Sequence, residues 1–312
     1  MVFFRHTNEV IKMQQIIKAV DVYKSYHKAL VLKGLNLTVN KGQIVGLLGP
    51  NGAGKTTTIR LLNGVIGPDK GQLEVFGLTP EKSGDKIRSL CGVLTESAGL
   101  YPHLSGEQNL AFFGELYGVT KKEVRYDLLK DFGLLEHKDK KVGSYSTGMK
   151  KRLGIAKALL PSPELLFLDE PTTGLDPEGA RDLLSYIEKL NKEKGVTILI
   201  CTHILKQVEE LCHRFLFLDS GRIIEEGTLE EIEAKYLKEF LVRVETDVSV
   251  SNISSSFQLI THTPGKLTFK LSNKSDIPIL LRHLLEKGSV YSSEILGRDL
   301  ETMYFKIREA GR

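Results

Sequence analysis

Apolar runs of strand length alternate with helix-like segments through the first two-thirds of the chain. Residues 16–22 and 35–40 alternate like half-buried strands, whereas residues 44–49 are continuously apolar and run into a glycine-rich turn and a helix-like segment. Two more continuous apolar runs, at 165–169 and 197–202, are separated by a helical stretch. Such runs are typical of strands buried on both faces of a parallel sheet. The pattern therefore predicts an α/β layered fold.

Two segments depart from this alternation. Residues 97–160 contain no buried apolar run, and the spacing of Leu110, Phe113 and Tyr117 is helical, so we predict a mostly helical insertion there. Residues 215–227 predict a strand, a Ser-Gly turn and a second strand.

The pattern changes again after Gly227. Thr228 and Glu231 have capping-box spacing, and alternating strand-like segments and helix-like segments follow. We predict three parts. They are an N-terminal extension at 1–15 that could be disordered, with Met13 as an alternative start, a main domain at 16–227, and a small α+β accessory domain at 228–312.

Composition and charge narrow the function classes. The 312 residues are 41% hydrophobic and 26% charged, which is ordinary for a globular protein. A net charge of +4 is mild, so no nucleic-acid partner is expected. Cys91, Cys201 and Cys212 show no metal spacing and are predicted to be reduced and packed. No apolar run is long enough for a transmembrane helix, and the N-terminus does not resemble a signal peptide.

The glycine-rich turn matches the phosphate-loop pattern GxxxxGK[ST]. We expect positive φ and an open backbone at Gly49, Gly52 and Gly54, Lys55 on the phosphates and the Thr56 hydroxyl on Mg²⁺. A chance match is expected in about one chain in a hundred of this size, but a preceding strand and a following helix favour function. The motif residues are Gly49, Pro50, Asn51, Gly52, Ala53, Gly54, Lys55 and Thr56.

Three more candidates lie at predicted strand ends, where ligands bind in open α/β sheets. Asp169 and Glu170 follow the run at 165–169, and we expect Asp169 to hold Mg²⁺ and Glu170 to polarise the attacking water. Alone, two acids at a strand end would more often be merely solvated, and the phosphate loop reverses that preference. His203 follows TILICT and could contact the γ-phosphate or could be an ordinary surface histidine.

Taken together and in this order, these segments resemble the ATP-binding cassette (ABC) family of ATPases over about residues 16–227. The residues that carry the resemblance are GPNGAGKTT (49–57), YSTGMKKRL (145–153), LLFLDEPTTGLD (165–176) and THI (202–204). The resemblance implies a P-loop NTPase fold of ABC type, with a parallel-sheet ATPase core, an antiparallel β part and a helical insertion. It also implies ATP and Mg²⁺ as ligands.

The same resemblance implies roles for single residues. Tyr26 would stack on adenine, with Tyr23 as the nearby alternative, and Thr57 would join Lys55 and Thr56 on the phosphates and Mg²⁺. Glu170 would act as the base, His203 as a switch histidine, and Asp176 would form the loop that links two ATP sites in a dimer.

The signature segment departs from the family's usual LSGGQ. Here it is Tyr145-Ser146-Thr147-Gly148-Met149, so the serine and the second glycine are kept while Thr147 and Met149 replace glycine and glutamine. The kept pair would approach a γ-phosphate on the other subunit through a hydroxyl, amides and a helix N-terminus. The basic residues that follow, Lys150, Lys151, Arg152 and Lys157, are predicted to form a solvated helix face.

Glu96 stands where the family usually has a glutamine. A carboxylate could still ligate Mg²⁺, and we hypothesise that Glu96 senses Mg²⁺ and the γ-phosphate.

The variant signature and the tail resemble ATP-binding subunits of bacterial drug, antibiotic or sodium exporters. This implies a membrane-spanning permease on a separate chain, a second copy or a related ATPase as dimer partner, and a location on the cytoplasmic face of the membrane. One alternative is a soluble ABC ATPase of DNA repair or translation, which is disfavoured because this chain has one cassette, no sustained heptads and no zinc spacing. A regulatory nucleotide binder without turnover is disfavoured by Glu170.

Overall fold

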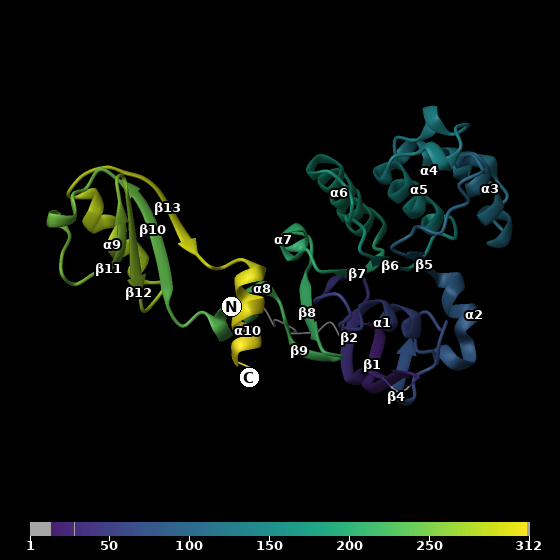
Figure 1. Ribbon diagram of the computed structural model, residues 1–312, viewed down its shortest axis with the longest axis horizontal. Helices are drawn as coiled ribbons and strands as arrows, with labels where there is room; N and C mark the ends of the chain where they lie inside the picture. The colour runs from purple at the N-terminus through teal and green to yellow at the C-terminus, as the bar shows by residue number, and fades with distance from the viewer. Residues whose placement is uncertain (1–13, 28, 311–312) are drawn as a thin grey trace, which may run out of the picture. The chain divides into compact units, whose positions relative to one another are not determined.

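The computed structural model describes residues 14–27 and 29–310 (Figure 1). It divides into two compact units, residues up to Glu226 and residues from Gly227 onward. The alternative start at Met13 and nearly all of the expected extension at 1–15 lie outside the described residues. Within the described part of the chain, no helix is both long and apolar enough to cross a membrane.

A six-stranded sheet forms the centre of the first unit. Its strands, in spatial order, are β5 (Cys91–Leu94), β6 (Leu165–Asp169), β7 (Thr197–Thr202), β3 (Ile44–Leu48), β8 (Arg214–Asp219) and β9 (Arg222–Gly227). The first five are mutually parallel. Every residue of β3, β6 and β7 is buried, as their continuous apolar runs predict.

A second, antiparallel sheet covers the helix that follows the phosphate loop. Its strands, in spatial order, are β2 (Ala29–Asn40), β1 (Gln15–Tyr26) and β4 (Lys70–Val75). Helix α1 (Lys55–Leu62) contacts β4 on one side and β6 and β7 on the other. One hydrophobic core therefore joins both sheets through α1, with Ile17, Leu61 and Phe167 among its buried members. Helix α2 (Pro80–Leu90) leads from β4 to β5.

Residues 97–160 contain three α-helices and two short 3₁₀ turns. These are α3 (Gly106–Leu116), α4 (Lys122–Asp131), η1 (Leu135–His137), η2 (Val142–Ser144) and α5 (Thr147–Leu159). Helices α3 and α4 pack on α5, and α5 packs on β5, so α5 connects the helical part to the sheet. Two helices of the core follow, α6 (Pro177–Lys194) and α7 (Leu205–Val208).

The second unit is a four-stranded antiparallel sheet with accompanying helices. In spatial order its strands are β11 (Gln258–Thr263), β12 (Lys266–Leu271), β10 (Phe240–Thr246) and β13 (Val290–Leu296). The other elements are α8 (Leu229–Tyr236), η3 (Val250–Asn252), α9 (Asp276–Leu285) and α10 (Leu300–Ala310). The predicted capping box is present, because Thr228 and Glu231 each accept the other's backbone N–H.

Candidate nucleotide site

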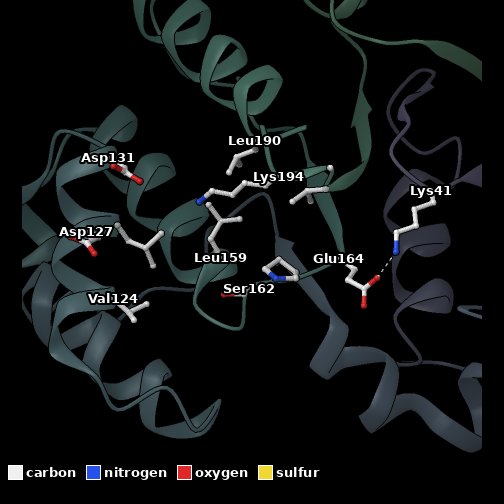
Figure 2. A pocket seen from close by; sticks show the side chains of 13 residues that line it. Lys41, Val124, Asp127, Asp131, Leu159, Ser162, Glu164, Leu190 and Lys194 are labelled. Carbon is white, nitrogen blue, oxygen red and sulfur yellow. Dashed lines mark hydrogen bonds and ion pairs between the residues drawn. The ribbon is translucent and has the colours of Figure 1, made fainter. Parts of the chain in front are cut away.

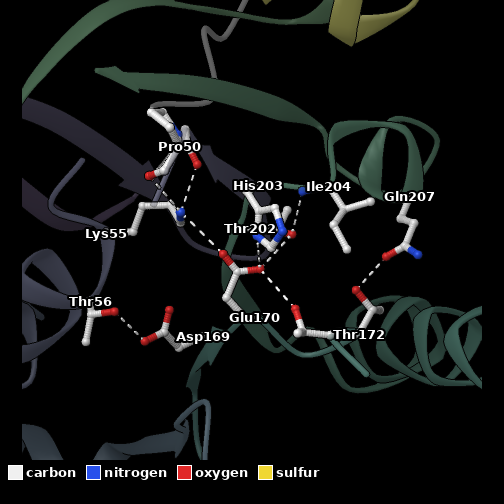
Figure 3. A network of polar contacts seen from close by, with 12 residues as sticks. Pro50, Lys55, Thr56, Asp169, Glu170, Thr172, Thr202, His203, Ile204 and Gln207 are labelled. Carbon is white, nitrogen blue, oxygen red and sulfur yellow. Dashed lines mark hydrogen bonds and ion pairs between the residues drawn. The ribbon is translucent and has the colours of Figure 1, made fainter. Parts of the chain in front are cut away.

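The candidate residues from three separate motifs meet at the carboxyl ends of neighbouring strands. Strands β6, β7 and β3 are adjacent in the sheet, and each is followed by one motif. The phosphate loop follows β3, Asp169 and Glu170 lie at the end of β6, and His203 follows β7. Figure 3 shows their side chains directed toward one another. The topology thus places the phosphate loop beside Asp169 and Glu170, which lie more than 100 residues later in the sequence.

The phosphate loop depends on two glycines for different reasons. Gly54 caps α1 with a φ of 114°, a conformation that L side chains rarely adopt. Gly49 does not have a positive φ, so the conformation expected for it was wrong. A Cβ at Gly49 would lie 2.1 Å from the carbonyl oxygen of Leu218, so this glycine allows close approach to β8.

Lys55 is buried at the centre of the site. Its Nζ donates to the carbonyl oxygens of Gly49 at 2.8 Å and Pro50 at 3.2 Å. The same Nζ lies 3.3 Å from Glu170 Oε1. The ammonium group is therefore held between the loop and the carboxylate, where a phosphate group would meet it.

The two carboxylate oxygens of Glu170 have different neighbours. Its Oε2 lies 3.0 Å from His203 Nδ1 and accepts a hydrogen bond from Thr202 Oγ1 at 3.1 Å. Its Oε1 is buried and lies 3.3 Å from Lys55 Nζ, and no other polar group among the described residues bonds to it. Burial raises the pKa of Glu170, but the His203 hydrogen bond and the charge of Lys55 outweigh it and lower the pKa overall. The carboxylate is therefore ionised at neutral pH, and Oε1, whose one polar partner in the described part of the chain is the Lys55 ammonium, is the oxygen that can accept a proton.

Thr56 and Asp169 offer oxygens of the kind that Mg²⁺ takes. Thr56 Oγ1 donates to Asp169 Oδ2 at 2.7 Å. Burial and the neighbouring charge of Glu170 raise the pKa of Asp169 against the opposing Thr56 hydrogen bond. Glu96 is exposed, and its charge also raises the pKa of Asp169. A hydroxyl and carboxylates suit Mg²⁺, a hard cation whose remaining ligands would be oxygens of phosphate and water.

The signature residues lie in a different cleft. Ser146 caps α5 by accepting the amide of Met149 at 3.2 Å, and Asp176 caps α6 by accepting the amide of Gly179 at 2.8 Å. Both lie in a cavity of about 490 Å³ that no phosphate-loop residue lines. Thr147 and Gly148 line the same cavity. The structure thus brings the signature to Asp176, and not to the phosphate loop of the same chain.

The two tyrosines considered for adenine lie on β1. The hydroxyl of Tyr26 is buried and has no hydrogen-bond partner in the described part of the chain. Tyr23 directs its ring at Gly34 across the β1–β2 hairpin, where a Cβ would come within 3.1 Å of the Tyr23 hydroxyl. Adenine stacking on Tyr26 stays a prediction.

Two of the lysines after the signature are buried, so the solvated face expected for them is wrong. Lys151 is 5% exposed and Lys157 is 8% exposed. Lys151 Nζ donates to the carbonyl oxygens of Glu96 at 2.8 Å and Glu170 at 2.9 Å. Lys157 Nζ donates to the carbonyl oxygen of Ala98 at 2.6 Å. For Lys157 the sequence signal was the surrounding LGIAKALL, which is apolar all round and typical of a buried helix, whereas Lys151 lies before this run.

Burial of Lys157 gives a testable dependence of stability on pH. Burial lowers the pKa of Lys157 from 10.5 to about 8. Between these values the unfolded chain binds more protons, so the unfolding free energy rises with pH by about 3 kcal/mol from this group. Urea unfolding followed by circular dichroism measures the unfolding free energy of the wild type and of Lys157→Met. Between pH 7.5 and 10.5 the difference between the two should shift in favour of the wild type by this amount. Lys150→Met is the matched control, and a parallel pH profile for Lys157→Met would contradict the expectation.

A second cavity, of about 450 Å³, lies near the amino ends of the strands (Figure 2). Ser162 and Glu164 precede β6, and Val196 precedes β7. Lys41 and Glu164 form an ion pair of 3.1 Å at its rim. It is lined by none of the candidate nucleotide residues.

Comparison with known proteins identifies the family. A family model described as ABC transporter matches residues 32–173. The bacitracin transport ATP-binding protein BcrA of Bacillus licheniformis is 42% identical over 72% of this chain and 74% of its own length. The chain belongs to the ABC transporter family. The linearmycin resistance ATP-binding protein LnrL of Bacillus subtilis is 34% identical over 84% of this chain and 85% of its own length.

Solved structures of ABC proteins share the fold. An ATP-binding subunit of an ABC transporter is 32% identical, with a TM-score of 0.65 over 71% of this chain and 93% of that one. A dimeric ATP-binding cassette solved after hydrolysis with ADP and Pi is 25% identical, with a TM-score of 0.60 over 68% of this chain and 98% of that one. The ABC-type P-loop fold is confirmed, and with it an ATP-binding subunit whose ATP hydrolysis is coupled to transport.

Proposed function

We propose that two copies of this ABC subunit, or one copy and a related ATPase, sandwich two ATP molecules and drive a membrane-spanning permease on a separate chain. The observation that carries this proposal is the separation of the two half-sites. Lys55, Asp169 and Glu170 form one, and Ser146 and Asp176 line another cleft. Each half lacks what the other provides, so a second subunit completes both.

Within the complete site, different residues bind different parts of ATP. Lys55, Thr57 and the loop amides bind phosphates, and Tyr26 stacks on adenine. Ser146 and Gly148 of the partner approach the γ-phosphate with a hydroxyl and the N-terminal amides of α5. Asp176 lies between the two sites.

The reacting end is formed by residues of β6 and β7. Glu170 accepts the proton of the attacking water, and His203 orients Glu170 and contacts the γ-phosphate. Thr56 and Asp169 would hold Mg²⁺, with Glu96 as an added oxygen ligand in place of the usual glutamine. The cation, when bound, would neutralise charge on the phosphates.

The transported compound is proposed to leave the cell. BcrA is named for bacitracin transport and LnrL for linearmycin resistance, and this chain spans most of both. We assign the chain to the cytoplasmic face of the membrane, held there by its permease, and to the export of drug-like or antibiotic compounds.

Fractionation tests this assignment. A tagged chain should sediment with membranes, and co-purify with a polytopic membrane protein, when the membrane gene beside it is co-expressed. Without that gene it should remain in the supernatant. Recovery with ribosomes or DNA in both cases would overturn the transport role in favour of a translation or repair ATPase.

A further inference from the structure

Lys151 links three segments that the sequence keeps far apart. It lies in the second turn of α5, just after the signature, and only 5% of it is exposed. Its ammonium group donates to the main-chain carbonyl of Glu96 at 2.8 Å and to that of Glu170 at 2.9 Å. Glu96 follows β5 and Glu170 follows β6. One buried cation therefore joins the signature helix to the backbone of the catalytic carboxylate.

The backbone of Glu170 needs such support. Glu170 has a φ of 50°, in the left-handed region that non-glycine residues rarely adopt. Its amide donates to the carbonyl of Cys201 at 2.8 Å, and its own carbonyl accepts from Lys151 and, at 3.4 Å, from the amide of Thr173. Such a conformation persists only when its surroundings hold it. Lys151 provides the shorter of the two bonds to this carbonyl.

Lys157 supports a second residue that has a left-handed backbone conformation. Ala98 has a φ of 58°, and its carbonyl accepts from Lys157 Nζ at 2.6 Å. Lys157 also lies over the ring of Phe113, 4.8 Å from its centroid. Both buried lysines of α5 thus fix left-handed residues through carbonyls, but only Lys151 reaches Glu170. Lys157 is therefore a matched control for the loss of a buried lysine from this helix.

We propose that Lys151 is a positioning residue that holds Glu170 in place for hydrolysis and ties it to the signature helix. The inference rests on the proposed dimer, in which the base of a subunit serves its own ATP and the signature of that subunit serves the ATP of the partner. A shift of α5 on contact with the partner's γ-phosphate would then move Lys151 and with it the base. ATP bound at one site would in this way affect hydrolysis at the other.

The test uses the full chain with Lys151→Met and Lys151→Arg. For Lys151→Met we expect kcat to fall about 10- to 100-fold, as for a misplaced catalytic group, while KM for ATP changes by less than about twofold. Dimers should still form with ATP on size exclusion, and should last longer than those of the wild type because hydrolysis is slow. Lys151→Arg keeps several donors and should recover much of the lost kcat. Lys157→Met should keep most of its kcat, and Lys150→Met all of it.

Other results separate the possible failures. A kcat for Lys151→Met within about twofold of wild type would overturn the positioning role, and so would equal loss in Lys157→Met. Loss of ATP binding or of dimers in Lys151→Met would also overturn it, because the role would then be structural. In each case the assignment of Glu170 as the base stands if Glu170→Gln is inactive, and it is wrong if Glu170→Gln hydrolyses ATP like the wild type, whereas the proposed transport function is tested by fractionation.

Discussion

Replacement of Glu170 by glutamine is expected to reduce ATP turnover by about 10²- to 10⁴-fold, the range for loss of a general base. The lowered pKa of Glu170 keeps the carboxylate ionised at neutral pH, and its Oε1, which among the described residues is paired with Lys55 alone, can accept a water proton. Glutamine keeps the shape and the contacts with Thr202 and His203 but cannot accept that proton. ATP affinity should stay near that of the wild type, because Lys55 and the phosphate loop are unchanged.

Steady-state release of phosphate and equilibrium binding of ATP measure the two quantities separately. Glu164→Gln is the matched control, because Glu164 precedes β6 at the opposite end of the same strand and is exposed. Its turnover should equal that of the wild type. Retained turnover in Glu170→Gln would show that another group activates the water, and the assignment of the base would be wrong.

How much of the fold could be predicted depended on the burial of each strand. Strands β3, β6 and β7 are buried at every position, so their composition alone marks them. Strands β11 and β13 lie at sheet edges and are largely exposed, so no alternation of apolar and polar residues marks them. Their pairing is set by backbone hydrogen bonds to a neighbour, which leaves little trace in hydrophobic periodicity.

Some residues of the candidate site could likewise be predicted from the sequence, and others could not. The phosphate loop, Asp169 and Glu170 are consecutive residues with a mechanism that fixes their spacing, so the sequence could predict them. Lys151 and Lys157 could not be assigned, because their partners are carbonyls of loops remote in the chain. The left-handed conformations of Glu170 and Ala98 have no sequence signal either, since glycine does not stand there.

Replacement of Ser146 by arginine is the sharpest test that a second subunit completes the site. Ser146 is exposed at the N-terminus of α5, facing the cleft it shares with Asp176. In the proposed dimer, an arginine there would fill the space of the partner's ATP. The variant should bind ATP as a monomer with unchanged affinity, fail to form ATP-dependent dimers, and lose about 10²-fold or more of its turnover, as when an oxyanion-binding group is lost.

Loss of the helix cap must be distinguished from loss of the shared site, because Ser146 also accepts the amide of Met149. Ser146→Ala removes the cap without adding bulk, and should cost about 1 kcal/mol of stability while dimers still form. Ser144→Arg adds the same bulk and charge two residues earlier, in η2, and should hydrolyse ATP normally. Sedimentation with and without ATP, beside phosphate release, gives the comparison. If Ser146→Arg dimerises and turns over like Ser144→Arg, then this residue only caps α5, and each ATP is hydrolysed without contact from the other subunit's signature.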